Sequence, residues 1–365
     1  MKNYIAVALF SIILIILTAC SHNADRIYED EAIYNETEII YEDEAVFDEN
    51  EIIYEDEVLF DENEIICYGD YERYEVVSML PLDEFAAYYF TRLQAMWDND
   101  DGEMWGVRFD SPVIIFCPET HMAAANRADT EGEFEKHYIN GTTVYMGIRQ
   151  FDFMGYGRAS WGDQIGVFVC VQDMQSGRLG TRGVYDRSLW NLMLINHNIL
   201  HSMQHHLMGV YGASPPHIND EQRVSIESEI NALVYAVTAN GDDKIIAINE
   251  ALAIRHARRE TFRSSGCVAA ENRMKLSEGM AVYSELHMVF DRNEIEVIIQ
   301  AWSEMFAQFS TFSVALGYGY YAGALYGMLL DDFGMEWRSQ LTASTDLGLM
   351  CKSIWNSYII LQGLA

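Results

Sequence analysis

The 365-residue sequence has few basic side chains: 23 lysines and arginines stand against 56 aspartates and glutamates, which gives a formal charge of -33 at pH 7. This excess of negative charge opposes binding to a phosphate backbone, so we expect no nucleic-acid partner. Hydrophobic residues make up 50% of the chain and aromatic residues 13%. That composition excludes collagen, coiled coil and wholesale disorder, and it is enough to bury a sizeable core.

Cysteine is also scarce. The six cysteines are scattered, and none belongs to a Cys-x-x-Cys pair. Their spacing argues against a zinc ribbon and against a complete disulfide framework. We therefore predict no disulfide bonds.

Met1-Lys2-Asn3 is followed by an apolar run over residues 4–17, which is typical of an export signal and too short for a typical membrane-spanning helix. The run closes with Leu17-Thr18-Ala19-Cys20, which resembles the lipoprotein box of bacteria. This resemblance implies that residues 1–19 are a lipoprotein signal peptide and that Cys20 is lipidated. The protein is then expected at the extracytoplasmic face of the cell membrane, held there by a lipid anchor. A buried core helix at the start of the chain is the alternative.

An acidic repeat follows. Residues 27–66 contain 17 acidic and no basic side chains, and the segment Ile-Tyr-Glu-Asp-Glu recurs every 13 residues, starting at Ile27, Ile40 and Ile53. Like charges repel and keep a chain extended, so residues 20–75 are predicted to be the lipidated cysteine and an acidic spacer. Loose binding of divalent cations is the alternative, although no calcium-loop motif is present.

Residues 76–365 are predicted to form one folded domain. Residues 82–97 read as a helix, and the β-branched or aromatic runs at 111–117, 143–146 and 165–170 read as strands of a small mixed sheet. From about residue 186 the sequence is almost continuously helical. Strands followed by helices predict an α+β fold.

Four of the ten histidines lie within residues 197–206. In a helix, residues four apart lie one above the other, so His197 and His201 share one face and their rings can meet at one point. Helices present two imidazoles to a zinc ion in this way. Partly buried histidines with ordinary hydrogen bonds are the alternative.

Two glutamates are further candidates. Glu229 falls in the apolar stripe of the helical pattern over residues 226–237, where a buried carboxylate needs either a metal or an arginine. Glu278 precedes Gly279 inside another helical pattern, and it either orients a ligand histidine or lies on the surface. The glycine costs about 1 kcal/mol relative to alanine, which indicates a close approach by another element.

Together these motifs resemble, in order, a bacterial family of gluzincin-type zinc metallopeptidases. The matching segments are His197-Asn198-Ile199-Leu200-His201 followed by Gln204, Glu229 before Ala232-Leu233, and Glu278-Gly279-Met280-Ala281-Val282-Tyr283. The resemblance covers roughly residues 90–345. It implies a zincin-like fold, a zinc ion bound by His197, His201 and Glu229, and a peptide or protein substrate or ligand.

One position departs from the family pattern, because Asn198 stands where the family has its catalytic glutamate. That glutamate takes a proton from the attacking water and returns it to the leaving amine, which an amide cannot do. The sequence therefore predicts a surface-anchored, zinc metallopeptidase-like protein that is catalytically impaired or inactive. The alternative is an active extracytoplasmic peptidase that uses another base, either Glu278 or a tyrosine among residues 318–321.

Overall fold

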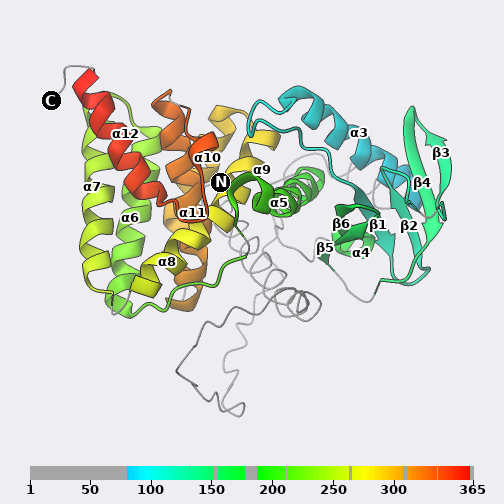
Figure 1. Ribbon diagram of the computed structural model, residues 1–365, viewed down its shortest axis with the longest axis horizontal. Helices are drawn as coiled ribbons and strands as arrows, with labels where there is room; N and C mark the ends of the chain where they lie inside the picture. Colours follow the sequence, from blue (N-terminus) through cyan, green and yellow to red (C-terminus); the bar gives the residue numbers. More distant parts are fainter. Residues whose placement is uncertain are drawn as a thin grey trace, which may run out of the picture.

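The computed structural model describes residues 80–130, 132–151, 155–176, 187–210, 212–262, 265–306, 311–334 and 336–361 (Figure 1). The predicted signal peptide, the lipidation site at Cys20 and the acidic repeat all lie outside these residues. Within them, no helix is both long enough and apolar enough to cross a membrane.

Apart from α3, the helices of the described part follow the strands along the chain. The strands are β1 (Val113–Cys117), β2 (Met122–Ala125), β3 (Glu135–Ile139), β4 (Thr142–Ile148), β5 (Tyr156–Trp161) and β6 (Gln164–Cys170). The α-helices are α3 (Leu82–Asp100), α4 (Val171–Ser176), α5 (Arg187–Met208), α6 (Asp220–Thr238), α7 (Gly241–Glu260), α8 (Ser265–Met274), α9 (Met280–Val289), α10 (Arg292–Phe306), α11 (Thr311–Asp332) and α12 (Leu347–Leu361). A π-helical turn (Lys275–Gly279) joins α8 to α9, and a 3-10 turn (Arg338–Gln340) precedes α12.

The six strands form one sheet in the order β3-β4-β2-β1-β6-β5, in which β1 and β6 are parallel and the other neighbours are antiparallel. The predicted α+β class and mixed sheet are therefore confirmed, and the predicted strands correspond to β1, β4 and β6. The sequence analysis missed β2, β3 and β5. Strand β2 has the sequence Met-Ala-Ala-Ala and β3 is mostly exposed and polar, so neither carries the β-branched apolar signal of a strand. A zincin-like arrangement stays a prediction.

Both faces of the sheet are covered at its centre. Val113 and Ile115 of β1 belong to the main core, together with Phe90 and Leu93 of α3, whereas Ile114 belongs to a smaller cluster on the other face. Helix α3 packs against β1, β2 and β4. Because β1 is buried on both faces, it reads in the sequence as a continuous apolar run rather than an alternating one.

Helix α5 connects the sheet to the helical half of the molecule (Figure 1). It contacts β5 and β6 on one side and α9 on the other. The buried indole of Trp97, near the end of α3, donates a hydrogen bond of 3.1 Å to the side chain of Asn196 on α5. Asn196 directly precedes His197, so this bond fixes α5 at the point where the predicted site begins.

The helical half is built around α11, which contacts α6, α9, α12 and the π-turn. Its glycines allow backbones to approach closely: a Cβ atom added to Gly279 would lie 2.5 Å from Gly323 Cα and 2.6 Å from Gly319 O. The close approach predicted at Gly279 is therefore confirmed. Helix α6 begins with a reciprocal pair of hydrogen bonds in which Asn219 and Gln222 cap each other's backbone.

The four cysteines in the described part, namely Cys117, Cys170, Cys267 and Cys351, are free thiols. Cys20 and Cys67 lie outside that part. Cys351 is buried, and burial raises the pKa of its thiol to about 12.

Candidate metal site

His197 and His201 lie one turn apart on α5 and point to the same side, as predicted. Their side chains are almost fully buried, with 1% and 5% of their surface exposed. The two Nε2 atoms are 3.0 Å apart. The rings meet edge to face, with their centroids 4.6 Å apart.

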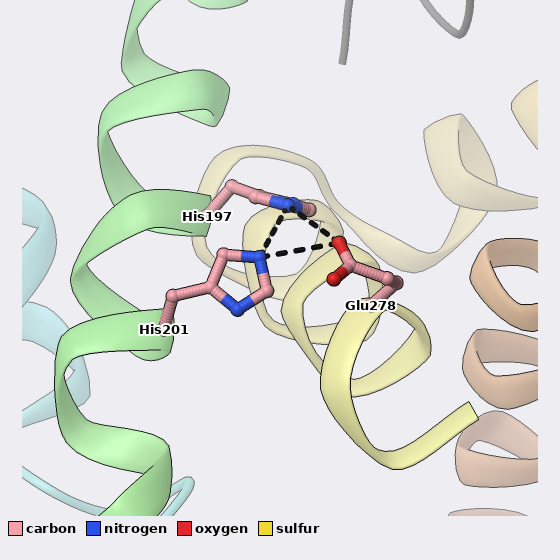
Figure 2. A group of neighbouring side chains, drawn as sticks. All are labelled: His197, His201 and Glu278. Atoms are coloured by element: carbon pink, nitrogen blue, oxygen red, sulfur yellow. Dashed lines mark hydrogen bonds and ion pairs between the residues drawn. The ribbon is translucent and has the colours of Figure 1, made fainter. Parts of the chain in front are cut away.

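Glu278 completes a group of three around these nitrogens (Figure 2). It is carried by the π-turn, and its Oε2 atom lies 3.6 Å from His197 Nε2 and 3.2 Å from His201 Nε2. Among the residues that the structure describes, this buried oxygen has no hydrogen bond of acceptable geometry. The other oxygen, Oε1, accepts a bond of 3.1 Å from the Ser277 hydroxyl. A buried carboxylate oxygen without a donor is costly, so a cation would satisfy it.

The distances between the three atoms suit a transition metal. Zinc binds histidine nitrogen and carboxylate oxygen at about 2.0 to 2.2 Å, which puts neighbouring ligand atoms of a tetrahedron about 3.3 to 3.5 Å apart. The three observed distances are 3.0, 3.2 and 3.6 Å. Two imidazoles and one carboxylate also match a donor set of catalytic zinc sites, which keep the fourth position for water or substrate. The group can therefore hold one metal ion.

Each imidazole has a partner on its outer nitrogen. His197 Nδ1 lies 2.9 Å from Glu285 Oε2 on α9, and His201 Nδ1 lies 2.9 Å from Gln204 Oε1 on α5 itself. When these oxygens accept a proton from Nδ1, both Nε2 lone pairs point into the site. Partners of this kind commonly orient histidine ligands and make them more basic.

The two carboxylates of the site differ in their electrostatics. Burial raises the pKa of Glu278, but His201 and His197 outweigh it and hold that pKa well below its usual range. Burial also raises the pKa of Glu285, and here the attraction of His197 offsets only part of the effect. Glu278 is thus the carboxylate poised to stay charged, as a metal ligand must be.

The structure does not bring Glu229, which was predicted as a metal ligand, to the two histidines; it binds a different cation. Its Oε2 accepts a bond of 2.6 Å from the Arg258 guanidinium, and its Oε1 accepts bonds of 2.8 Å from the hydroxyls of Tyr318 and Tyr326. Both oxygens are occupied, and the residue is fully buried. The apolar stripe predicted a cation correctly, but that cation is the arginine. Conversely, Glu278, expected to orient a histidine from behind or to lie on the surface, faces both imidazoles directly.

Glu229 belongs to a larger cluster, which we call the ion network. It consists of Glu229, Arg255, Arg258, Arg259, Glu271, Lys275 and Asp346. Lys275 donates a bond of 2.9 Å to Glu271, and burial of its ammonium lowers its pKa to about 8. The network adjoins the π-turn, because Lys275 is the first residue of that turn.

Asn198 does not point at the ligand atoms. Its amide donates a hydrogen bond of 2.8 Å to the carbonyl of Leu194, one turn earlier in α5, and the residue is half-buried. Among the tyrosines considered as substitute bases, Tyr318 donates its hydroxyl to Glu229, and burial raises its pKa well above the usual range. Tyr318 is therefore hydrogen-bonded to the ion network and is not a base for the site.

The sequence analysis missed Glu285 and gave no role to Gln204. A signal for Glu285 was present, because it is an acidic residue within the apolar run of α9 and stands seven residues after Glu278. For Gln204 the sequence offers its place after the histidine motif, three residues and about one helical turn from His201.

No protein-family model matches the chain, and no curated protein or solved structure matches it either. The resemblance to gluzincin-type peptidases therefore remains a prediction from short motifs.

Proposed function

We propose that the protein binds one zinc ion through His197, His201 and Glu278 and is a metallopeptidase-like protein whose hydrolytic step is impaired. The observation that carries this proposal is the buried Oε2 of Glu278, which has no hydrogen bond of acceptable geometry among the described residues and faces two imidazole nitrogens. The resemblance of the surrounding motifs to zinc peptidases favours zinc among the metals and a peptide or protein as substrate or ligand.

When bound, zinc would supply a Lewis acid that polarises a carbonyl group. The chain itself supplies orientation: Glu285 and Gln204 hold the Nδ1 sides of the imidazoles, so the Nε2 atoms point inward. A group that takes a proton from water is missing at residue 198, because an amide has no basic site near neutral pH. A peptide carbonyl could thus be bound and polarised, while its hydrolysis lacks the usual base.

The alternative is an active peptidase with a different base. Glu278 is needed as a ligand in our proposal, and Tyr318 is committed to the ion network. Tyr320 lies nearer to the site, with its ring parallel to that of His197 and the centroids 6.2 Å apart. Its contribution can be tested by replacing it with phenylalanine in the same peptidase assay.

The proposal is tested by elemental analysis of the full-length protein purified without chelators. We expect one zinc per chain in the wild type and none in His201→Ala. His206→Ala is a matched control, because this exposed histidine lies on the same helix outside the group and its loss should leave the zinc content unchanged. A wild-type protein without metal would overturn the zinc proposal, and efficient zinc-dependent peptide cleavage by the wild type would overturn the impaired step.

We further propose that the protein is anchored to the extracytoplasmic face of the membrane by a lipid on Cys20. This part rests on residues 1–75 alone. Replacing Cys20 with alanine should release the protein from the membrane fraction or leave the precursor uncleaved. Normal cleavage with unchanged membrane retention would contradict it.

A further inference from the structure

The π-turn changes the direction in which the chain between α8 and α9 presents its side chains. At 100° per residue, a continuous α-helix would place Glu278 within about 20° of Glu271, seven residues earlier. In the structure Glu271 and Lys275 bind the ion network, whereas Glu278 faces the histidines of α5. A π-turn holds more residues per turn than an α-helix, so side chains within and after it face directions that a continuous α-helix would not give them. The turn therefore separates the two clusters and brings Glu278 to the histidines.

Gln204 contacts the π-turn and a candidate ligand at the same time. Its amide nitrogen donates to the carbonyl of Ser277 and, at 3.3 Å, to the carbonyl of Leu276. Its amide oxygen lies 2.9 Å from His201 Nδ1. Because carbonyls only accept hydrogen bonds, the nitrogen end of the amide must face the π-turn and the oxygen end must face the histidine. His201 must then carry a proton on Nδ1, so the neutral imidazole presents its Nε2 lone pair to the site.

The opposite side of the π-turn is held by α11. A Cβ atom added to Gly323 would lie 2.5 Å from the carbonyl oxygen of Lys275 and 2.6 Å from Gly279 Cα. The backbone of the turn is thus enclosed between the glycines of α11 and the Gln204 amide. On the α5 side, Gln204 is the side chain that bonds to the carbonyls of this turn.

We propose that Gln204 is a positioning residue that couples the two halves of the metal site, an inference that rests on the proposed function. One end of its amide holds the π-turn at the rotation that directs Glu278 to the histidines. The other end selects the Nδ1-protonated form of His201. A single side chain thereby sets the distance between the carboxylate ligand and the imidazoles and the direction of one imidazole lone pair.

Three variants of the full-length protein separate these roles. Gln204→Met removes both ends of the amide at similar volume. Gln204→Glu keeps an acceptor for His201 and adds a negative charge beside it, but its carboxylate oxygen cannot donate to the two carbonyls, so the contact with the π-turn is lost. Gln222→Met is the matched control, because Gln222 is also buried and doubly hydrogen-bonded but lies at the start of α6.

Two measurements are made on each variant. The affinity for Zn²⁺ comes from competition with a chromophoric chelator, and the ligand geometry comes from the visible spectrum of the Co²⁺-loaded protein. Partners of metal ligands typically contribute about 10- to 100-fold to affinity, so we expect losses of that size in both Gln204 variants, together with altered Co²⁺ spectra. Gln222→Met should stay within about two-fold of the wild type and keep its spectrum.

A third measurement does not depend on metal. NMR of the metal-free protein with ¹⁵N-labelled histidine should show His201 protonated on Nδ1 in the wild type and in Gln204→Glu, but a mixture of tautomers in Gln204→Met. The signal is identified by its loss in His201→Ala. If the wild type binds no metal, the proposed function fails, and the tautomers alone decide the role of Gln204. Unchanged tautomers in Gln204→Met, or zinc affinity within two-fold of the wild type with an unchanged Co²⁺ spectrum, would overturn the inference.

Discussion

The metal site and the ion network are two buried polar clusters in the same helical half, and each contains a glutamate that the sequence had marked. They differ in their cations. The ion network has three arginines and a lysine for its three carboxylates, and both oxygens of Glu229 are hydrogen-bonded. The metal site has only imidazoles facing Glu278, and one of its oxygens has no donor among the described residues. The carboxylates of the first cluster are matched by protein cations, and Glu278 is not.

This difference shows how to interpret a glutamate in an apolar stripe. The stripe predicts that the carboxylate is buried and needs a positive partner. Whether that partner is a protein side chain or a metal depends on which helix packs opposite. Glu229 of α6 is met by Arg258 of α7, whereas Glu278 of the π-turn is met by the histidines of α5. The predictions that follow test this contrast.

The largest expected effect is on metal content. Glu278→Gln removes the charged oxygen from the site and should abolish stoichiometric zinc, because a neutral amide is a weak ligand for zinc. Glu229→Gln should keep one zinc per folded chain, measured by elemental analysis. The reverse result, with zinc lost in Glu229→Gln and retained in Glu278→Gln, would restore the ligand set implied by the family resemblance.

For stability the order of the same two variants should be reversed: Glu229→Gln should lower the free energy of unfolding more than Glu278→Gln does. Glu229→Gln removes one of the two carboxylates that bind the buried Arg258, and breaking a buried pair typically costs about 3 to 5 kcal/mol. In metal-free protein, Glu278→Gln should cost less free energy of unfolding than Glu229→Gln, because only two imidazoles and the Ser277 hydroxyl face its carboxylate. Urea denaturation in the presence of a chelator measures both. Equal losses of unfolding free energy would mean that protein groups stabilise the Glu278 carboxylate as much as they stabilise that of Glu229.

A gain of activity is the third expected effect. Asn198→Glu restores a carboxylate beside His197, where it can reorient from the backbone of α5 toward the open side of a bound metal. Peptidase activity should rise by about 100-fold or more, which is within the range for a general base. The comparison requires zinc-loaded samples of both proteins and a peptide mixture as substrate. Continued inactivity of the zinc-loaded variant would indicate a binding role for the site.

The smallest effect concerns pH and the ion network. Burial lowers the pKa of Lys275 to about 8, whereas an unperturbed lysine titrates near 10.5. Between these values the unfolded chain binds more protons than the folded one, so the free energy of unfolding should rise with pH. We expect a contribution of about 1 to 2 kcal/mol between pH 8 and 10.

This contribution is measured as the difference between wild type and Lys275→Met in urea denaturation at several pH values. Lys244→Met is the control, because Lys244 pairs with Asp332 away from the network and is not fully buried. The control should keep the wild-type slope. Parallel pH profiles for wild type and Lys275→Met would show that Lys275 is charged throughout this range.

Several features were determined by the sequence alone because they depend on local pattern. Residues four apart on a helix share a face, so His197 and His201 had to meet once α5 formed. The β-branched runs identified β1, β4 and β6, and the order of strands and helices indicated the α+β class. The glycine at residue 279 indicated a backbone contact, which α11 provides.

Only the tertiary structure decided which carboxylate joins the histidines. Glu229 and Glu278 carry the same signal, an acidic residue in an apolar helical pattern, and sequence spacing does not reveal which helices pack together. The π-turn adds a second difficulty, since its larger number of residues per turn directs Glu278 away from Glu271 although their spacing of seven places them on one helical face. The ligand set is therefore a property of helix packing and of one irregular turn, neither of which can be read from a regular helical period.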